Sequence, residues 1–481
     1  MEKNFEKEQL VKKSEDFPKW YTEVILRSGL ADYAPVKGCQ VIRPYGYAIW
    51  ENIKNVLDKM IKDAGVKNAY FPLFIPEKFL KKEKEHIKGF SPELAVVTIG
   101  GGKELEEKLI VRPTSETIIY DMYSKWIKSW RDLPVLINQW ANVVRWEKRP
   151  RLFLRTTEFL WQEGHTVHET HEEAIEEAKR ALRDYVKLYR EFFAIDGIWG
   201  IKSESEKFPG AQATYTYEML MPSGIALQGC TSHDLGQNFS KVFGIKFQDR
   251  NGKEQIPWQT SWGLSTRSIG AFIMAHGDDS GLIIPPKLAP IQVVIIPIFQ
   301  GKDNSNESLI KKVEEIKRDL GDFKVEIDKR KEYSVGWKFN EWELKGVPLR
   351  IEIGEKEIKK NKATFVRRDN GEKREVAFRE LALEVGKELE SIQDNLFEKS
   401  RQNLQRQIKE VSDYKTFKKI MKEEKGFIKA FWCVGAECES KIKKETKATI
   451  RCLPFDAPEE NGECVFCRKK SREKWIFGQA Y

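Results

Sequence analysis

Long hydrophobic runs are missing from this 481-residue chain. The longest, IQVVIIPIF at 291–299, is far shorter than the roughly 20 apolar residues that a membrane span requires. The N-terminal stretch MEKNFEKEQL is charged and lacks the apolar segment of a secretory signal. We therefore expect a cytoplasmic protein that does not contact membranes.

Cysteine is also scarce, with seven residues, and this odd number argues against a disulfide framework. Four cysteines nevertheless form two close pairs near the C-terminus, Cys433 with Cys438 and Cys464 with Cys467. Two turn-like pairs of thiolates suit tetrahedral Zn²⁺, and a closed ligand set of this kind is structural rather than catalytic. Cys452 lies between the pairs and is expected to stay outside the site, although spacing alone leaves it open as a ligand.

Familiar nucleotide-binding loops are absent. There is no G-x-x-x-x-G-K-[S/T] and no G-x-G-x-x-G between a strand and a helix, and the GGGK at 100–103 is followed by Glu104 where a hydroxyl is needed. HTVHETHEE at 165–173 also fails the H-E-x-x-H pattern of zinc proteases by one residue. These absences disfavour a parallel-sheet nucleotide fold and a zinc protease.

The net charge of +9 is modest but unevenly placed. Residues 401–481 contain 19 Lys and Arg against 12 Asp and Glu. A basic terminal region favours a polyanionic partner, and a solvated lysine face is an equally good explanation.

Several strand-like runs follow one another in the first part of the chain, most without intervening helices. They are rich in aromatic and β-branched residues and lie at 109–114, 135–147, 155–169, 213–239 and 258–276. This succession predicts an antiparallel sheet. Thr170 and Glu173 form a capping box that predicts a helix immediately after the third run.

The pattern of predicted strands and helices changes after GLIIPPKLAP at 281–290. The prolines of this segment predict an exposed linker. Strands and helices then alternate, and a cysteine-bearing tail follows. We predict an α+β protein with three domains: an antiparallel catalytic domain at 1–285, an α/β domain at 286–395 and a small zinc-binding α+β domain at 396–481.

Charged residues interrupt the apolar stretch VVRWEKRPRLFLRTTEF at 143–159. Buried charge is costly unless it is paired or serves a ligand. Arg145-Trp-Glu147, the loop KRPRLFL and Arg155-Thr-Thr-Glu-Phe159 resemble motif 2 of class II aminoacyl-tRNA synthetases, which binds ATP. A ladder of paired charges on an ordinary sheet would explain this motif if it stood alone.

Neighbouring motifs extend the resemblance to the prolyl-tRNA synthetase family over essentially the whole chain. They occur in the family's order and are RPTSE (112–116), LWQEGHT (160–166), QGCTSHDLGQNF (228–239) and SWGLSTRSIGA (261–271). The resemblance implies ATP-dependent attachment of L-proline to tRNA(Pro) through prolyl-adenylate, with Mg²⁺ accompanying ATP. It also implies a homodimer built on motif 1, at GCQVIRPYGYAIWENI (38–53) and FPLFIP (71–76).

The resemblance further implies roles for individual residues. Arg145 would hold the proline carboxylate and the α-phosphate of ATP, and Arg155 and Arg267 would hold the terminal phosphate, so that Arg145 and Arg267 are the catalytic pair. The other implied ATP contacts are Glu147, Phe159, Gln228 and Thr231.

For proline, Thr114 and Glu116 would bind the secondary ammonium. The implied pocket walls are Phe90, Trp161, His165 and His233. A simple turn or helix cap remains an alternative for Thr-Ser-Glu, and a hydrogen-bonded core histidine remains one for His165.

Several implied properties concern partners. In KGVPLRIEIG (345–354), Glu352 is a candidate anticodon contact, or merely a surface strand residue. The carboxylate of Tyr481 would reach toward the catalytic domain, and a disordered terminus is the alternative. Only about 100 residues separate Phe159 from Arg267, so the chain resembles the archaeal/eukaryotic-type form without an editing insertion, and a separate trans-editing protein is expected.

Three other classes stay open. They are a non-catalytic paralogue that binds RNA, a class II synthetase for threonine, histidine, glycine or serine, and a zinc-containing RNA-binding protein without enzymatic activity. The joint presence of the motifs favours the prolyl enzyme over each of them.

Overall fold

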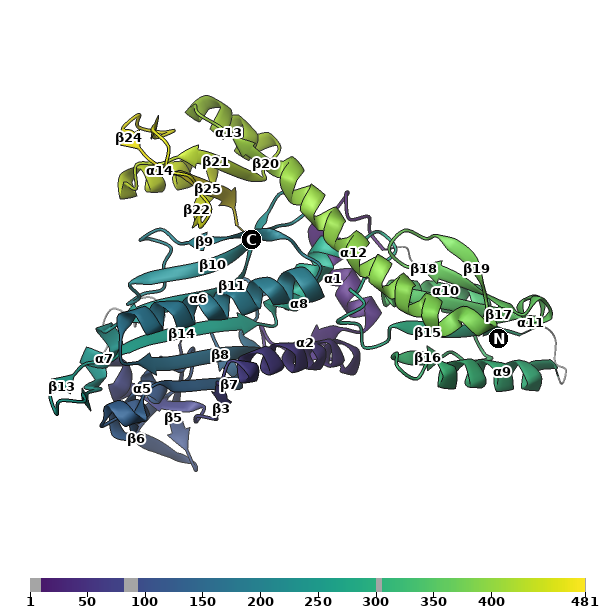
Figure 1. Ribbon diagram of the computed structural model, residues 1–481, viewed down its shortest axis with the longest axis horizontal. Coiled ribbons are helices and arrows are strands. Elements are labelled where there is room, and N and C mark those ends of the chain that lie inside the picture. The colour runs from purple at the N-terminus through teal and green to yellow at the C-terminus, as the bar shows by residue number, and fades with distance from the viewer. Residues whose placement is uncertain (1–9, 82–93, 300–304, 481) are drawn as a thin grey trace.

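The computed structural model describes residues 10–81, 94–299 and 305–480 (Figure 1). A large sheet with its helices lies at the left of the view, an α/β unit lies at the right, and a smaller C-terminal unit lies above the sheet. The long helix α12 (Leu381–Gln407) runs diagonally between the last two. Within the described residues, no helix has the length and apolar character needed to cross a membrane.

Eleven strands form the large sheet, in the order β20-β21-β25-β22-β9-β10-β11-β14-β8-β7-β3. Its central strands pair antiparallel, which confirms the predicted sheet type. The strands contributed by the first 285 residues are β3 (Lys67–Asn68), β7 (Val135–Val144), β8 (Glu158–His168), β9 (Gly197–Ile201), β10 (Ala213–Leu220), β11 (Ala226–Gly236) and β14 (Trp258–Ser265).

Helices cover this sheet, with α6 (His171–Lys187) packed on β10, β11 and β14. Both hydrogen bonds of the predicted capping box at Thr170 and Glu173 are present. The other helices of this part are α1 (Phe17–Ser28), α2 (Pro44–Asp63), α3 (Glu77–Lys81), α5 (Glu116–Trp126), α7 (Asn238–Phe243) and α8 (Arg267–His276). The smaller strands are β1 (Ala31–Tyr33), β2 (Gln40–Ile42), β4 (Phe74–Pro76), β5 (Ala95–Gly100), β6 (Lys103–Val111), β12 (Phe247–Gln248) and β13 (Glu254–Gln255).

The prediction of a strand over 258–276 is correct only for its first part. The observed strand β14 ends at Ser265, and helix α8 begins at Arg267. Helix α8 is buried on almost every side, so its sequence has no polar face to reveal a helical period. Gly270 lets it approach the loop after β7, since a Cβ there would lie 2.5 Å from a methyl group of Leu154.

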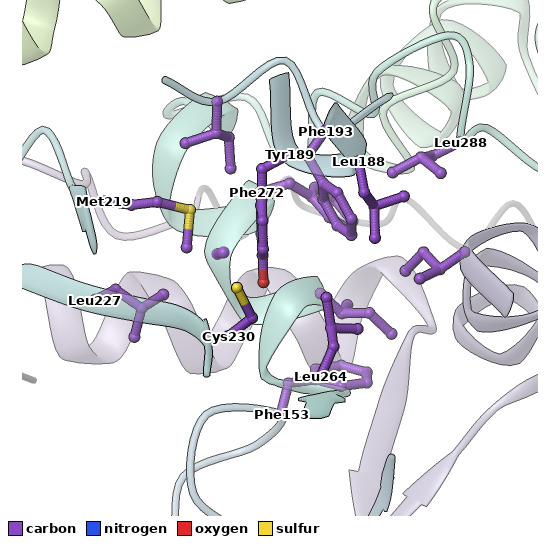
Figure 2. Packing of buried hydrophobic residues seen from close by; sticks show 14 of the residues in the cluster. Phe153, Leu188, Tyr189, Phe193, Met219, Leu227, Cys230, Leu264, Phe272 and Leu288 are labelled. Carbon is purple, nitrogen blue, oxygen red and sulfur yellow. The ribbon is translucent and has the colours of Figure 1, made fainter. Parts of the chain in front are cut away.

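The core beside α8 is seen in Figure 2, where Tyr189 lies close to Cys230 and Phe272. The Tyr189 hydroxyl donates to the carbonyl of Gly229 at 2.9 Å. This core therefore supports β11 directly behind the residues that the sequence assigns to ATP.

The segment 281–290 is not an exposed linker, contrary to the prediction. Leu282, Ile284 and Leu288 are fully buried and belong to the main core. Backbone N–H groups of Leu282 and Ile284 donate to Leu344 and Gly346. The apolar residues of this segment thus form a buried seam between the large sheet and the α/β unit.

The α/β unit has a five-stranded sheet in the order β16-β15-β17-β18-β19, and the predicted alternation of strands and helices is confirmed. Strands β15 (Val293–Ile298), β16 (Val325–Ile327) and β17 (Leu349–Gly354) are parallel, whereas β18 (Lys362–Arg367) and β19 (Lys373–Ala377) add antiparallel partners. Its helices are α9 (Ser305–Asp319), α10 (Val335–Leu344) and α11 (Glu355–Lys360).

The C-terminal unit, residues 408–480, continues the large sheet. Strand β22 (Ala448–Pro454) pairs with β9 through Leu453 and Ile201. Its other elements are β20 (Ile408–Glu410), α13 (Tyr414–Glu423), β21 (Phe427–Phe431), α14 (Ala436–Thr446), β23 (Gly462–Glu463), β24 (Lys470–Ser471) and β25 (Lys474–Gln479). The domain limits stay predictions, and the limit at 395 falls inside α12.

Candidate active site and four-cysteine site

A cavity of about 290 Å³ opens over β8, β11 and β14. Glu163, the loop residues Glu206 to Pro209 and the β14 residues Ser261 to Ser265 contribute to its walls. Ten of the predicted substrate residues also line it: Thr114, Glu116, Arg145, Phe159, Trp161, His165, Gln228, Thr231, His233 and Arg267. Residues distant in sequence thus meet at one small cavity.

Positive charge concentrates at one side of this cavity. Burial and the charges of Arg145 and Arg155 together lower the pKa of Arg267 to about 10. Arg267 Nε donates to the Leu154 carbonyl at 3.1 Å, and Arg145 Nε donates to the Pro113 carbonyl at 3.0 Å. Three neighbouring guanidinium groups repel one another, so an anionic ligand is the natural occupant of this side.

Aromatic rings flank Arg145. Its guanidinium lies 5.4 Å from the ring centre of Phe159 and 5.5 Å from that of Trp161. These rings pack edge to face at 6.2 Å. Glu147 and Arg155 stand outside the cavity lining and are 3.6 Å apart, with Arg155 45% exposed.

Carboxylates lie farther along β8, where Glu163 and His165 follow Phe159 and Trp161 on the same face of the strand. Thr114 Oγ1 donates to Glu116, and both side chains are buried. Glu163 lies beneath them and accepts hydrogen bonds from Ser115 and from Gln139 Nε2, the latter at 2.7 Å. Two carboxylates at this end suit a cationic group of a ligand.

His165 connects this network to the cavity wall. Its Nε2 lies 3.0 Å from Glu163 and its Nδ1 lies 3.2 Å from the Tyr120 hydroxyl. Burial opposes charge on both residues, yet their hydrogen bond and the charge of Glu116 raise the pKa of His165, while hydrogen bonds lower that of Glu163. His165 is therefore hydrogen-bonded as the alternative supposed, and it also lines the cavity.

His233 forms part of the far wall. Its Nδ1 lies 2.9 Å from the Thr214 hydroxyl, and its ring stacks on Phe208 at 4.5 Å. Cys230 belongs to the lining as well, but its thiol lies in the core beside Tyr189 (Figure 2), where burial raises its pKa. Phe90 and Tyr481 lie outside the described residues.

The four predicted cysteines converge in the C-terminal unit. Among the described residues they form the one group of at least three potential ligands whose atoms all lie within 4.8 Å of one another. Cys433 Sγ is 3.6 Å from both Cys438 Sγ and Cys467 Sγ. Tetrahedral Zn–S bonds of about 2.3 Å would place the sulfurs roughly 3.8 Å apart, so the four thiols fit a zinc ion. Cys452 is fully buried elsewhere, on β22.

In the α/β unit, Glu352 is largely buried and pairs with Arg350 at 2.9 Å. Sequence reasoning missed a nearby aromatic stack, in which Tyr333 and Trp337 lie 3.9 Å apart with Arg330 over both rings. Tyr333 is 38% exposed. The aromatic residues in the basic stretch KRKEYSVGWK were the available signal.

Glu163 was also missed, although it stands inside LWQEGHT, because only the fold shows that it lies under the cavity. The same holds for Phe208, whose segment resembles no motif. Both residues line the cavity and contact predicted site residues directly, Glu163 through His165 and Phe208 through His233.

Comparison with known families defines the class. Residues 97–276 match the family described as the tRNA synthetase class II core domain (G, H, P, S and T), and residues 292–388 match an anticodon binding domain. The three-part α+β fold is that of a class II aminoacyl-tRNA synthetase, and the chain is an enzyme of this class.

Further matches identify the family. Residues 414–481 match the family "Prolyl-tRNA synthetase, C-terminal". A proline–tRNA ligase of Clostridioides difficile is 52% identical over 98% of both chains, and one of Natranaerobius thermophilus is 51% identical over 100% of both. A crystal structure of prolyl-tRNA synthetase from Cryptosporidium parvum, complexed with halofuginone and AMPPNP, is 43% identical over 98% of this chain and 99% of that one, with a TM-score of 0.94. The chain belongs to the prolyl-tRNA synthetase family.

Proposed function

We propose that this chain joins L-proline to tRNA(Pro) in two steps. The proline carboxylate attacks the α-phosphate of ATP and displaces pyrophosphate, and a terminal ribose hydroxyl of the tRNA then attacks the prolyl-adenylate and displaces AMP. One observation carries this proposal: a single small cavity is lined by arginines and by buried carboxylates. Such a cavity can accept a zwitterionic amino acid and direct its carboxylate toward a phosphate.

Proline occupies the acidic side. Glu116, oriented by Thr114, supplies the counter-charge for the secondary ammonium. Trp161, His165 and His233 enclose the ring, and Phe90 remains a predicted fourth wall. Glu163 fixes the position of His165 through their hydrogen bond.

ATP occupies the basic side. Arg145 contacts both the proline carboxylate and the α-phosphate, which brings two mutually repelling anions into line and stabilises the charge of the transition state. Arg155 and Arg267 bind the terminal phosphate, and Mg²⁺ neutralises the phosphates when bound. The remaining proposed contacts with ATP are Glu147, Phe159, Gln228 and Thr231.

No side chain is needed as a covalent nucleophile, because both attacking groups come from the substrates. A small apolar pocket rejects larger amino acids sterically, but a substrate lacking a methylene loses only about 1–3 kcal/mol of binding free energy. Alanine and cysteine are therefore expected to be activated weakly.

The α/β unit binds the anticodon. Unstacked RNA bases bind to aromatic rings and arginine planes, which the exposed stack of Tyr333 and Trp337 under Arg330 offers. Glu352 is a second candidate contact, provided that a base amino group replaces Arg350 as its partner. The four cysteines hold one structural Zn²⁺ in the C-terminal unit.

The enzyme is proposed to be a cytoplasmic homodimer. Tyr33, Val41 and Tyr47, at or near motif 1, are 60%, 50% and 43% exposed, as expected for an apolar contact surface. A mass measurement in solution that gave only monomer would contradict the dimer.

We also propose that the enzyme lacks cis editing. The chain from β8 to α8 is occupied by α6, α7, strands of the large sheet and the small hairpin of β12 and β13. A separate protein would then hydrolyse mischarged alanyl-tRNA. Purified enzyme that deacylates this product would contradict the proposal.

The main experiment is ATP–pyrophosphate exchange with each of the twenty amino acids. Proline should support exchange, alanine and cysteine should support it weakly, and Arg145→Ala should abolish it. Arg149→Ala is the matched control, since Arg149 is exposed in the same loop. Exchange with another amino acid alone would refute the proline assignment, and no exchange at all would favour the non-catalytic alternative.

A further inference from the structure

The segment between β9 and β10 forms part of the cavity wall. We call residues 203–209 the cavity loop, of which Glu206, Lys207, Phe208 and Pro209 line the cavity. The ring of Phe208 stacks on His233, and its backbone N–H donates to Thr214 Oγ1 at 2.9 Å. The conformation of this loop therefore decides where one wall of the proposed proline pocket stands.

Helix α14 of the C-terminal unit holds the other side of the loop. One carboxylate oxygen of Glu439 accepts hydrogen bonds from the hydroxyls of Ser203, at 3.3 Å, and Ser205. Lys443, one turn later, lies 3.6 Å from Glu206. Glu439 is only 8% exposed, and hydrogen bonds to a buried carboxylate are stronger than those between neutral groups.

The base of the loop is fixed by the same unit. Strand β22 pairs with β9 immediately before the loop. Beside this contact, the buried carboxylate of Glu218 binds Lys202 at 2.6 Å and Arg451 at 2.6 Å. The cavity loop thus begins at a well-anchored contact between β9 and β22. Beyond this contact, Glu439 binds the loop itself through Ser203 and Ser205.

The placement of Glu439 is tied to the four-cysteine site. Glu439 follows Cys438 directly, and both side chains are buried on α14. A metal ion bound by Cys438 would therefore also fix the helix turn from which Glu439 reaches the loop.

We propose that Glu439 is a positioning residue for the proline pocket, acting through the cavity loop. A wall that is already ordered does not lose conformational entropy when proline binds, so proline binds more tightly than to a loose loop. This inference rests on the proposed function for its kinetic consequence, whereas the attachment of the loop to α14 can be measured without substrate.

The test compares Glu439→Ala with Glu439→Gln, whose amide oxygen can still accept from Ser203 and Ser205. Glu437→Ala is the matched control, because Glu437 is exposed on the same helix. In ATP–pyrophosphate exchange, Glu439→Ala should raise KM for proline about tenfold, while kcat and KM for ATP change by less than about twofold. Glu439→Gln and Glu437→Ala should match the wild type.

Hydrogen exchange of the cavity loop is the second readout. The N–H groups of Glu206 and Lys207 donate to the Ser203 carbonyl at 3.1 and 2.9 Å, so they report on the order of the loop. Their exchange should be faster in Glu439→Ala and unchanged in the other two variants. This readout keeps its meaning even if the wild type proves not to use proline, which is how failure of the proposed function would be recognised.

The zinc content of Glu439→Ala shows whether an effect of this variant comes from the cavity loop or from damage to the four-cysteine site. If Glu439→Ala keeps its zinc and shows wild-type loop exchange and KM for proline, the inference is wrong. If Glu439→Ala loses zinc, the double variant Ser203→Ala with Ser205→Ala is tested instead, because it leaves α14 intact. A raised KM for proline together with faster hydrogen exchange in the loop would support the inference. Wild-type values of both quantities would refute it.

Discussion

The cavity and the α/β unit use arginine in opposite ways. Arg267 has its pKa lowered to about 10 by burial and by Arg145 and Arg155, and its side chain has no ion pair with a carboxylate in the described part of the chain. Arg367 binds Asp369 through two hydrogen bonds and Glu388 through one, all between 2.8 and 2.9 Å, and the bonds to Asp369 raise its pKa. Charge that is left uncompensated indicates a place for a ligand, whereas compensated charge supports the fold.

Histidine shows the opposite arrangement, because here the group in the cavity is the one whose charge is compensated. Burial opposes charge on His165, but the hydrogen bond to Glu163 outweighs it and the pKa of His165 is raised. His276 lies outside the cavity, and burial there lowers its pKa to about 4. The residue type alone therefore does not distinguish a ligand-binding group from a structural one.

Replacing each of the two arginines, Arg267 and Arg367, by methionine is expected to give the largest effects and tests this contrast. Arg267→Met should lower the rate of ATP–pyrophosphate exchange about 10²–10³-fold, because a donor to the transition state is lost. Its free energy of unfolding should not decrease, since repulsion with Arg145 and Arg155 is relieved.

Arg367→Met should do the reverse. It leaves Asp369 and Glu388 buried without this partner, which costs about 3 kcal/mol of the free energy of unfolding. Denaturant unfolding and exchange assays on both variants give the comparison, and a stable Arg367→Met enzyme with impaired exchange would break it.

Cysteine provides the next test. Cys464→Ser should reduce bound zinc from one per chain to a small fraction, measured by elemental analysis, because a site with three thiolates is incomplete. Cys452→Ser should keep one zinc per chain. Equal zinc loss in both variants would mean that the ligand set has been assigned incorrectly.

The pH dependence of stability tests the histidine contrast. The pKa of folded His276, about 4, lies below the usual 6.5, so the unfolded chain binds the proton more readily. Stability is therefore lost as the pH falls from about 6.5 toward 4, and His276 alone should remove about 2 kcal/mol between pH 7 and pH 5. Unfolding of His276→Gln should show a pH dependence that is weaker by this amount.

The smallest effect is expected for Arg155, which is 45% exposed beside Glu147. Arg155→Ala should change the free energy of unfolding by less than about 0.5 kcal/mol, as for other exposed pairs. It should nevertheless lower kcat/KM for ATP about tenfold, the usual loss for one hydrogen bond to a charged group. Unchanged ATP kinetics would remove Arg155 from the proposed site.

The sequence predicted elements whose signals are local. The capping box at Thr170 predicted α6, and the alternation of strand-like and helical segments after residue 290 predicted the α/β unit. Arg145 and Arg267 were selected through motifs, and the structure brings them to one cavity, although their roles remain proposals.

Other features depend on contacts between distant residues. The buried seam at 281–290 looked like a linker because prolines exclude regular elements, but they say nothing about burial. Glu439 binds residues more than 230 positions away, and no local pattern carries that information.

The position of β25 has a consequence for synthesis of the chain. This strand ends at Gln479, yet it lies between β21 and β22. A ribosome must therefore make the chain through residue 479 before the C-terminal unit can close, whereas strands β3 to β14 are available to pair much earlier. A nascent chain interrupted before residue 474 would expose the pairing edges of both β21 and β22, which makes it prone to aggregation.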